Sequence, residues 1–319
     1  MPQLNLTKGH GCGVDVVVID AAPAGVEDRL ELLVRRLCDR RGPVGAEAAY
    51  FVDGSADEVV AWCFGPGGAP ARGSAYGVGV VGRVLADRRG TDHVVLRLGD
   101  DRFVVHRSDD SPEGVRRVSV EGPVVDFWPD VVGRVVPQFH ERRSVTAVGV
   151  PEPQLVSIVG RYDEDELIDV GRRVSADHDS FPDQPDVTFL MPLDEGDEAF
   201  ARTYEYGIGV SRSSSAGVAA ARAVCSRLGI VGPETSVLVR TPGGPVRAAL
   251  KVDSESWIPV LETNATLTYH AVLDPELLAS PGPIALDLQA NVEEVMAYAA
   301  LRSANARALE AAGVRYAAP

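Results

Sequence analysis

The chain has 319 residues, a length typical of two domains, and its 45% hydrophobic and 24% charged residues are typical of a soluble globular protein. Its net charge of −15 offers no basic excess to replace the counterions of a nucleic acid, so we expect no nucleic-acid partner. No run of 18 apolar residues is present, which excludes a membrane-spanning helix.

The four cysteines are widely spaced and form no Cys-x-x-Cys pair. Such spacing is typical of free thiols in a reducing compartment, not of disulfides or a zinc site. The first 13 residues lack the basic segment and apolar core of a signal peptide. We therefore expect a cytoplasmic protein without metal or cofactor, with small core residues at Cys12, Cys38, Cys63 and Cys225.

In the first half, β-branched runs bounded by turns predict strands at residues 14–19, 57–64, 93–99, 101–108 and 115–122. Leucines at helical spacing predict a helix over residues 26–40. A second helix of small and branched residues is predicted over residues 76–86. Glycine and proline make residues 65–73, just before that helix, a loop.

In the second half, strands are predicted at residues 155–160, 186–193, 236–241, 246–252 and 267–273. A Gly/Ser-rich loop leads into a helix over residues 216–228, and an alanine-rich amphipathic helix is predicted over residues 291–312. The carboxylate-rich residues 163–166 indicate a solvated loop or a helix start. Prolines and polar residues make 130–153 the candidate crossing between domains.

The two halves repeat one pattern, because Arg72-Gly-Ser74-Ala-Tyr-Gly77 and Arg212-Ser-Ser214-Ser-Ala-Gly217 place Arg, Ser and Gly at the same offsets before Ala/Val-rich helices. Unpaired N–H groups and the helix dipole make each turn an anion site. We expect the two turns to face each other across one pocket and to bracket a small acidic substrate. The alternative is a pair of ordinary N-cap serines.

These turns and further segments together resemble the diaminopimelate epimerase family over most of the chain. In the first half the family's Lys-x-His-Gly-x-Gly-Asn-Asp-Phe, Cys-Asp-Arg, Phe-Asn-Pro-Asp-Gly and Cys-Gly-Asn-Gly-x-Arg-Cys segments fall on residues 8–16, 38–40, 64–68 and 74–80. In the second half Phe-Pro-x-x-x-Asn-Val, Tyr-Glu-Arg-Gly-x-Gly-Glu-Thr and Ala-Cys-Gly-Thr-Gly fall on residues 181–187, 204–211 and 213–217.

The resemblance implies an α/β (α+β) fold of two pseudo-symmetric domains, each with antiparallel strands around a central helix and with a cleft between them. It implies that the last strand and the tail return to the first domain. We expect the first domain to comprise residues 1–148 and 263–319, and the second residues 149–262. The tail helix is longer than the family needs, and it either covers the first domain or forms a homodimer contact.

The family racemises an α-carbon with two cysteine thiols, and both of those positions are serine here, at Ser74 and Ser214. A serine hydroxyl is a far poorer base than a thiol and needs an activating partner. The family's asparagines and its arginine are also replaced, by Val14, Gly65, Gly160, Asp186 and Tyr206. Loss of the arginine removes a bidentate carboxylate clamp, so we expect a larger and less charged substrate, with Tyr76 and Tyr206 at the mouth of the cleft.

The candidate catalytic residues are Ser74, Ser214, Tyr76, Tyr206 and Glu205. The candidate substrate-binding residues are His10, Val14, Gly65, Ala75, Gly77, Asp186, Ser215, Ala216 and Gly217. Each has a structural alternative: helix caps for the serines, buried aromatic packing for the tyrosines, a loop histidine for His10 and an ordinary ion pair for Glu205.

Three functions remain open at this stage. The first is a cofactor-independent isomerase or cyclase of bacterial secondary metabolism, acting on a substrate other than diaminopimelate by positioning and hydrogen bonding. The second is an amino-acid epimerase whose bases are not cysteines. The third is a non-catalytic binding or scaffold protein. In the first two, the partner of the protein is a small-molecule substrate.

Overall fold

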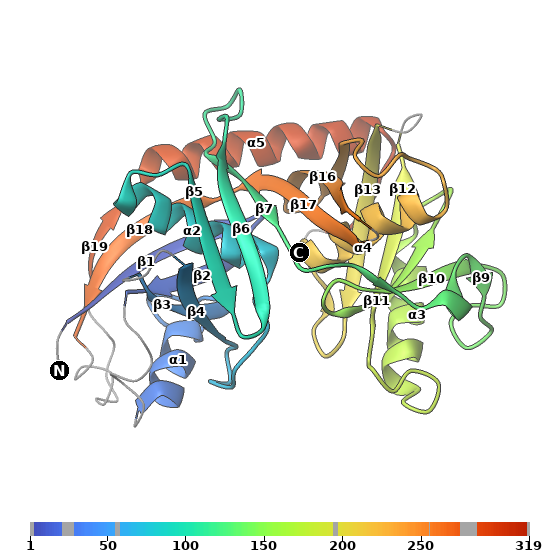
Figure 1. Ribbon diagram of the computed structural model, residues 1–319, viewed down its shortest axis with the longest axis horizontal. Helices are drawn as coiled ribbons and strands as arrows, with labels where there is room; N and C mark the ends of the chain where they lie inside the picture. Colours follow the sequence, from blue (N-terminus) through green and yellow to red (C-terminus); the bar gives the residue numbers. More distant parts are fainter. Residues whose placement is uncertain are drawn as a thin grey trace. The chain divides into compact units, whose positions relative to one another are not determined.

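Contacts within the chain separate the computed structural model into two units (Figure 1). The structure describes residues 3–20, 29–54, 58–193, 197–254, 256–274 and 286–317. Unit 1 comprises Met1–Val120 and Thr263–Ala300, and unit 2 comprises Glu121–Glu262 and Leu301–Pro319. The chain therefore passes from unit 1 to unit 2 after Val120, whereas the sequence led us to expect this boundary after residue 148. The tail does not return to unit 1 as a whole, because its last part belongs to unit 2.

The elements of unit 1 begin with a hairpin and enclose one helix. They are β1 (Leu4–Gly11), β2 (Val14–Ile19), α1 (Leu30–Cys38), β3 (Ala48–Asp53), β4 (Glu58–Phe64), α2 (Ala75–Arg89), β5 (His93–Leu98), β6 (Asp101–Ser108), β7 (Arg117–Glu121), β18 (Thr266–Leu273) and β19 (Asp287–Ala290). Residues 26–28 of the first predicted helix and residue 57 of the second predicted strand lie outside the described residues.

Unit 2 follows a similar plan. Its elements are β8 (Asp126–Phe127), the 3₁₀ turn η3 (Pro129–Val131), β9 (Arg134–Val135), β10 (Ser144–Gly149), β11 (Pro153–Ile158), α3 (Glu164–Ala176), β12 (Asp186–Pro192), β13 (Glu198–Glu205), β14 (Gly209–Val210), α4 (Ser215–Arg227), β15 (Val237–Thr241), β16 (Gly244–Asp253) and β17 (Ser256–Asn264). The helix α5 (Val292–Ala311) follows near the end of the chain.

The order β2-α1-β3-β4-α2-β5 in unit 1 recurs in unit 2 as β11-α3-β12-β13-α4-β15, with the short strand β14 inserted before α4. This is the pseudo-symmetry expected from the sequence. The pairs β2–β3, β4–β5, β11–β12 and β13–β15 are parallel. Parallel neighbours need a crossover connection, and the four helices supply these crossovers. Antiparallel pairs such as β1–β2 and β12–β13, as expected from the sequence, are thus combined with parallel pairs in a mixed arrangement.

The second helix of each repeat is the central one. In α2 every residue from Tyr76 to Ala86 is buried, and in α4 every residue from Gly217 to Cys225 is buried. A helix that is buried on all sides needs small and branched apolar side chains, which is the composition of both. By contrast, α1 and α3 bury only one face each, against the outer side of the strands.

The carboxylate-rich segment at 163–166 is a helix start, one of the two alternatives given by the sequence. The Asp163 side chain caps α3 by accepting a hydrogen bond from the backbone N–H of Glu166, at 3.2 Å. The acidic residues that follow lie in the first turn, where the helix dipole favours negative charge. No helix in the described part of the chain combines the length and apolarity needed to cross a membrane.

The tail helix α5 matches the predicted range and buries a single face. Tyr298 in unit 1, and Asn305 and Leu309 in unit 2, lie on that face. The Asn305 side chain donates to the Thr241 carbonyl oxygen at 2.9 Å and accepts from Arg240 at 3.1 Å. Each end of the helix is thus bound to a different unit by its own contacts.

Candidate active site

Each central helix begins at one of the two predicted serines. The Ser74 Oγ accepts a hydrogen bond from the Gly77 N–H at 3.0 Å, and the Ser214 Oγ accepts one from the Gly217 N–H at 3.1 Å. Both serines are half-buried N-caps, so the capping alternative is correct for both. Capping uses each oxygen as an acceptor only. The hydroxyl hydrogen remains able to donate to a ligand at the positive end of the helix.

Below the start of α2 lies a phenol that the sequence did not point to. The Tyr50 hydroxyl accepts a hydrogen bond from the Ser74 N–H at 3.1 Å and also bonds the thiol of Cys63. Burial raises the pKa of Tyr50 well above its usual value, so the phenol stays neutral. Gly77 leaves room for this ring, because a Cβ there would lie 2.6 Å from the Tyr50 Cζ. Tyr50 therefore holds the capped turn in place from beneath.

Below the start of α4, two buried threonines occupy the equivalent place. The hydroxyls of Thr188 and Thr203 lie 2.9 Å apart, and a Cβ added at Gly217 would lie 2.7 Å from the Thr188 Oγ1. Thr188 also donates to the Gln154 Oε1 at 3.3 Å. A chain of hydrogen bonds thus runs under α4 and ends at Asp186, whose Oδ2 accepts from the Gln154 Nε2 at 2.8 Å.

Asp186 begins β12 and has only neutral donors among the described residues. Besides Gln154, the backbone N–H of Tyr206 donates to its Oδ1 at 2.8 Å. Burial raises the pKa of the Asp186 carboxyl, while the hydrogen bonds from Tyr206 and Gln154 lower it in part. The result is a half-buried carboxylate that is a stronger base than an exposed aspartate. The sequence had assigned it only a substrate contact.

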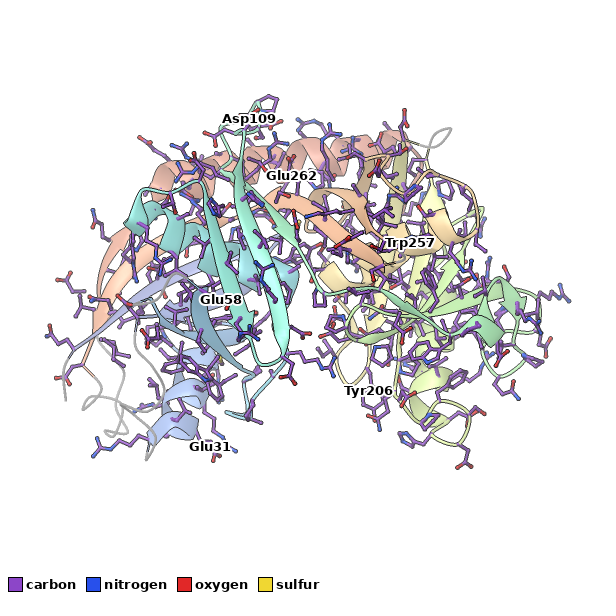
Figure 2. The ribbon with its side chains drawn as sticks, viewed as in Figure 1. Glu31, Glu58, Asp109, Tyr206, Trp257 and Glu262 are labelled. Carbon is purple, nitrogen blue, oxygen red and sulfur yellow. The ribbon has the colours of Figure 1, made fainter. Side chains whose placement is uncertain are left out.

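The remaining unit 2 candidates lie at the end of β13 and at the start of α4. Glu205 ends β13, and Tyr206, labelled in Figure 2, follows it in the turn to β14. Both residues are half-buried. Ser215 and Gly217 are buried in the first turn of α4, and Ala216 is half-buried. In the loop before α4, the Ser211 Oγ is buried without a hydrogen-bond partner, a condition that a bound water or ligand would relieve.

In unit 1 the β1–β2 turn packs against the start of α2. A Cβ at Gly11 would lie 2.8 Å from the Tyr76 Cβ, which places this turn against the first helical residues. Tyr76 is only 1% exposed. We had expected Tyr76 at the mouth of a cleft, but it is a packed core residue. Half-buried Val14 and Gly65, and Ala75 next to Ser74, complete the unit 1 candidates.

His10 is a structural histidine in this arrangement. It is 7% exposed, and its ring packs on Tyr298 with centroids 4.2 Å apart. The Asn264 side chain donates to the His10 carbonyl oxygen at 3.1 Å and accepts from the Cys12 N–H at 2.8 Å. Asn264 was not predicted, because it reaches the turn from a strand about 250 residues away. His10 lies in strand β1, so it is not the loop histidine of the structural alternative, although its contacts are those of a packed residue.

The four cysteines do not replace the missing thiols. All four are buried thiols, as expected of small core residues. Burial raises the pKa of Cys38 to about 11 and that of Cys225 to about 11, so neither forms a thiolate at neutral pH. In the described part of the chain, no group of three His, Cys, Asp or Glu side chains is placed to hold a metal ion.

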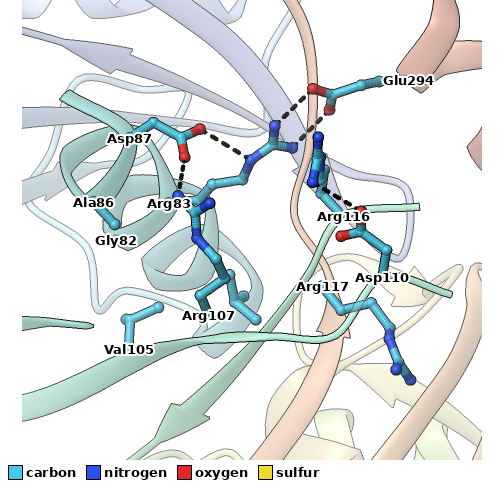
Figure 3. A pocket seen from close by; sticks show the side chains of 11 residues that line it. Gly82, Arg83, Ala86, Asp87, Val105, Arg107, Asp110, Arg116, Arg117 and Glu294 are labelled. Atoms are coloured by element: carbon cyan, nitrogen blue, oxygen red, sulfur yellow. Dashed lines mark hydrogen bonds and ion pairs between the residues drawn. The ribbon is translucent and has the colours of Figure 1, made fainter. Parts of the chain in front are cut away.

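A charged cavity of about 150 Å³ lies in unit 1 beside the second half of α2 (Figure 3). Arg83 forms a bidentate pair with Glu294, with both distances 2.6 Å. Asp87 accepts from Arg107 at 2.5 Å, and Asp110 accepts from Arg116 at 2.8 Å. The lining comes from α2, β6, β7 and α5. Because these three arginines are already paired with carboxylates, the cavity is a poor site for an anion.

Comparisons with known proteins agree with this architecture. No protein-family model matches the sequence. The structure resembles a phenazine biosynthesis protein of the PhzF family from Bacillus anthracis, with a TM-score of 0.63 and 12% identity over 86% of this chain and 100% of that one. It also resembles a hydroxyproline epimerase from Agrobacterium vitis, with a TM-score of 0.61 and 14% identity over 85% and 92% of the two chains. The chain thus has the fold that these two proteins share.

Within this fold class the sequence resembles diaminopimelate epimerases. It is 23% identical over 288 residues to the enzyme of Clostridium acetobutylicum, covering 85% of this chain and 86% of the relative. It is 28% identical over 269 residues to that of Xanthomonas axonopodis pv. citri, covering 79% and 91%. The resemblance and fold class predicted from the sequence are therefore confirmed, and the chain is a divergent relative of isomerases.

Proposed function

We propose that the protein is an isomerase that moves a proton on a small carbonyl-bearing or carboxylate-bearing substrate other than diaminopimelate, without cysteine thiols. Asp186 carries this proposal, because it is a half-buried carboxylate with a raised pKa and only neutral hydrogen-bond donors. A carboxylate in that environment is a stronger base than an exposed one, which suits it to accept and return a proton.

The proton balance follows from these groups. Asp186 takes a proton from a carbon next to the substrate's carbonyl, and the electron pair moves into that carbonyl to give an enolate. The N–H groups at the start of α4, with the Ser214 hydroxyl, stabilise the negative oxygen. The protonated Asp186 then returns its proton to another carbon of the same conjugated system, so that no oxidant or cofactor is consumed.

A single carboxylate favours proton movement on one face of the substrate over inversion at a carbon. Inversion by the family's route needs a second base on the opposite face, and Ser74 at the corresponding position only caps its helix. We propose that the Ser74 turn binds an anionic or carbonyl group in place of supplying a base. A cyclase variant of the same chemistry would let the enolate attack an electrophilic carbon of its own molecule. We propose a role in bacterial secondary metabolism because the residues that replace the family's substrate contacts favour a substrate other than diaminopimelate.

The sequence similarity to diaminopimelate epimerases favours one second candidate, an amino-acid epimerase in which Asp186 replaces a cysteine. Both candidates use the same carboxylate and differ in their substrate. In the first candidate the labile hydrogen lies on a compound without an α-amino group, and in the second it lies on the α-carbon of an amino acid.

Solvent exchange separates these candidates. The protein is incubated in deuterated water with a panel of keto acids, unsaturated carboxylic acids and amino acids, and deuterium uptake is followed by mass spectrometry. We expect uptake into a non-amino acid, reduced about 100-fold or more in Asp186→Asn. Asp165→Asn, an exposed carboxylate in the first turn of α3, is the matched control and keeps full exchange. Exchange that is unchanged in Asp186→Asn would refute the proposed role of this residue.

A further inference from the structure

A second cavity lies in unit 2 and is lined mostly by apolar residues, unlike the charged cavity of unit 1. Its volume is about 350 Å³, within the usual range for sites that bind small molecules. Val145 and Ala147 from β10, with Pro153 and Leu155 from β11, form its floor. Ala147 and Leu155 are direct partners across the two strands, so these side chains share one face of the sheet.

This floor lies on the opposite side of the sheet from α4. Successive residues of a strand point to opposite faces, and Gln154, next to Leu155, belongs to the hydrogen-bond chain under α4. The side chain of Leu155 packs instead in the core cluster that includes residues of α3. The cavity is therefore separate from Ser214 and from the proposed chemistry.

Two stiff segments form the walls. One comprises Trp128, Asp130 and Val131 around η3, with Val136 beyond them. The other is the loop 180–185 after α3, which contains Pro182 and Pro185. Proline fixes one backbone dihedral and reduces the freedom of a loop, so this groove is largely formed before any ligand binds. Its lining is mostly apolar.

Two carboxylates are the charged groups of the lining, and no basic residue lines the cavity. Asp130 and Asp183 are both exposed, and neither has an ion-pair partner among the described residues. An apolar groove bordered by two unpaired carboxylates is complementary to an apolar group that carries a positive charge.

We propose that this groove binds small molecules composed of an aromatic or branched apolar group and a protonated amine. The apolar group covers the floor of Ala147 and Leu155, while the ammonium lies near Asp130 and Asp183. Each exposed carboxylate contributes little alone, so burial of the apolar group supplies most of the affinity and the charges supply selectivity.

Trp128 gives the site its own reporter, because it lines the groove and is 36% exposed. The test titrates the full chain with phenethylamine, phenethyl alcohol and 3-phenylpropanoate, which share a ring and differ in charge. We expect a saturable change in tryptophan emission, with the amine binding about fivefold to tenfold more tightly than the alcohol and the carboxylate binding most weakly. Trp128→Phe removes the signal while calorimetry still detects the amine.

Two variants separate the contributions. Asp130→Asn with Asp183→Asn alters only exposed side chains, and it removes the preference for the amine while leaving alcohol binding unchanged. Ala147→Leu fills the floor and abolishes binding of all three compounds, with circular dichroism confirming that the variant is folded. The proposal is overturned if phenethylamine gives no saturable response, if the carboxylate binds as well as the amine, or if folded Ala147→Leu still binds.

Discussion

The two units begin their central helices with the same capped serine but support them differently. Beneath α2 lies the Tyr50 phenol, which fills the space next to Gly77 with a ring. Beneath α4 lie two threonine hydroxyls, which connect through Gln154 to Asp186. One turn therefore rests on a closed aromatic contact, whereas the other rests on a polar chain that ends at a carboxylate.

The carboxylates of the two units differ in their hydrogen-bond donors. In unit 1 the Arg40 guanidinium donates to Asp15 at 2.7 Å and to Glu47 at 2.9 Å. In unit 2 Asp186 has a backbone N–H and an amide as its donors. Burial raises the pKa of Glu47, and the Arg40 guanidinium offsets this only in part, so the pKa of a carboxyl is raised in each unit. The comparison teaches that the repeated fold surrounds a raised-pKa carboxylate with a guanidinium in one unit and with neutral donors in the other.

The largest losses of stability are expected when alanine replaces Gly77 or Gly217, the glycines that contact the supporting side chains of the two helices. Gly77→Ala places a Cβ against the buried Tyr50 ring, and Gly217→Ala places one against the Thr188 and Thr203 hydroxyls. We expect each change to lower the free energy of unfolding by about 3 kcal/mol, measured by chemical denaturation.

Second-site changes then sharpen the comparison. Thr203→Ala should restore part of the stability lost in Gly217→Ala, because it removes one of the two clashing hydroxyls. Tyr50→Phe should not rescue Gly77→Ala, because ring carbons also clash there, with the Cζ at 2.6 Å. If Tyr50→Phe restored as much stability to Gly77→Ala as Thr203→Ala restores to Gly217→Ala, the two helix supports would not differ as described.

The next effect concerns the ion pair of unit 1 between Arg83 and Glu294. Glu294→Gln removes the bidentate partner of the mostly buried guanidinium and leaves it with the more distant Asp87, at 3.4 Å, and we expect a loss of about 3 kcal/mol at neutral pH. Burial raises the pKa of Glu294, but the Arg83 contacts outweigh burial and lower it below its usual 4.5. The stabilisation is thus present above pH 4.5 and is lost as the pH falls through the lowered pKa.

Denaturation of the wild type and of Glu294→Gln across this pH range checks the prediction. The two stability curves should converge in acid and diverge toward neutral pH. A constant difference between them at every pH would contradict the assignment of the stabilisation to the charge of Glu294.

A smaller effect is expected at the two caps. Ser74→Ala and Ser214→Ala each remove one hydrogen bond from a helix start, and each should cost about 1 kcal/mol in chemical denaturation. Similar losses would agree with the matched cap geometry. Ser74→Gly and Ser214→Gly serve as controls and should cost only a few tenths of a kcal/mol.

The smallest change in stability is expected at Asp186, with the opposite sign. Because the pKa of Asp186 is raised in the folded protein, its favourable contribution is present below its usual 3.8 and is lost as the pH rises through the raised value. Asp186→Asn should therefore have a higher melting temperature than the wild type at neutral pH, and this advantage should disappear in acid. A variant that is less stable at neutral pH would show that the charged carboxylate is structurally favourable.

The sequence predicted the elements best where periodicity was strong, as in the central helices α2 and α4. It missed β1, because Gly9 and Gly11 interrupt the β-branched pattern, although this strand pairs with both β2 and β18. The repeated Arg, Ser and Gly pattern located both capped turns correctly. Tyr50 and Thr203 escaped notice because they reach those turns from strands, through tertiary packing that no local pattern records.

The role of Asp186 illustrates the same limit. Its place in a family segment suggested a substrate contact, but its basicity depends on burial and on neutral donors from Gln154 and Tyr206. Burial is a property of the folded chain. The loss of both catalytic thiols, by contrast, could be read directly from the sequence, and the buried cysteines of the structure offer no replacement.

Deuterium exchange tests the central claim most directly. Wild type and Asp186→Asn are each incubated with diaminopimelate and with the acid panel in deuterated water. The account predicts no deuterium at the α-carbon of diaminopimelate, and uptake into a non-amino acid that is lost in Asp186→Asn. Deuterium at the α-carbon of diaminopimelate, incorporated equally fast by both proteins, would contradict it.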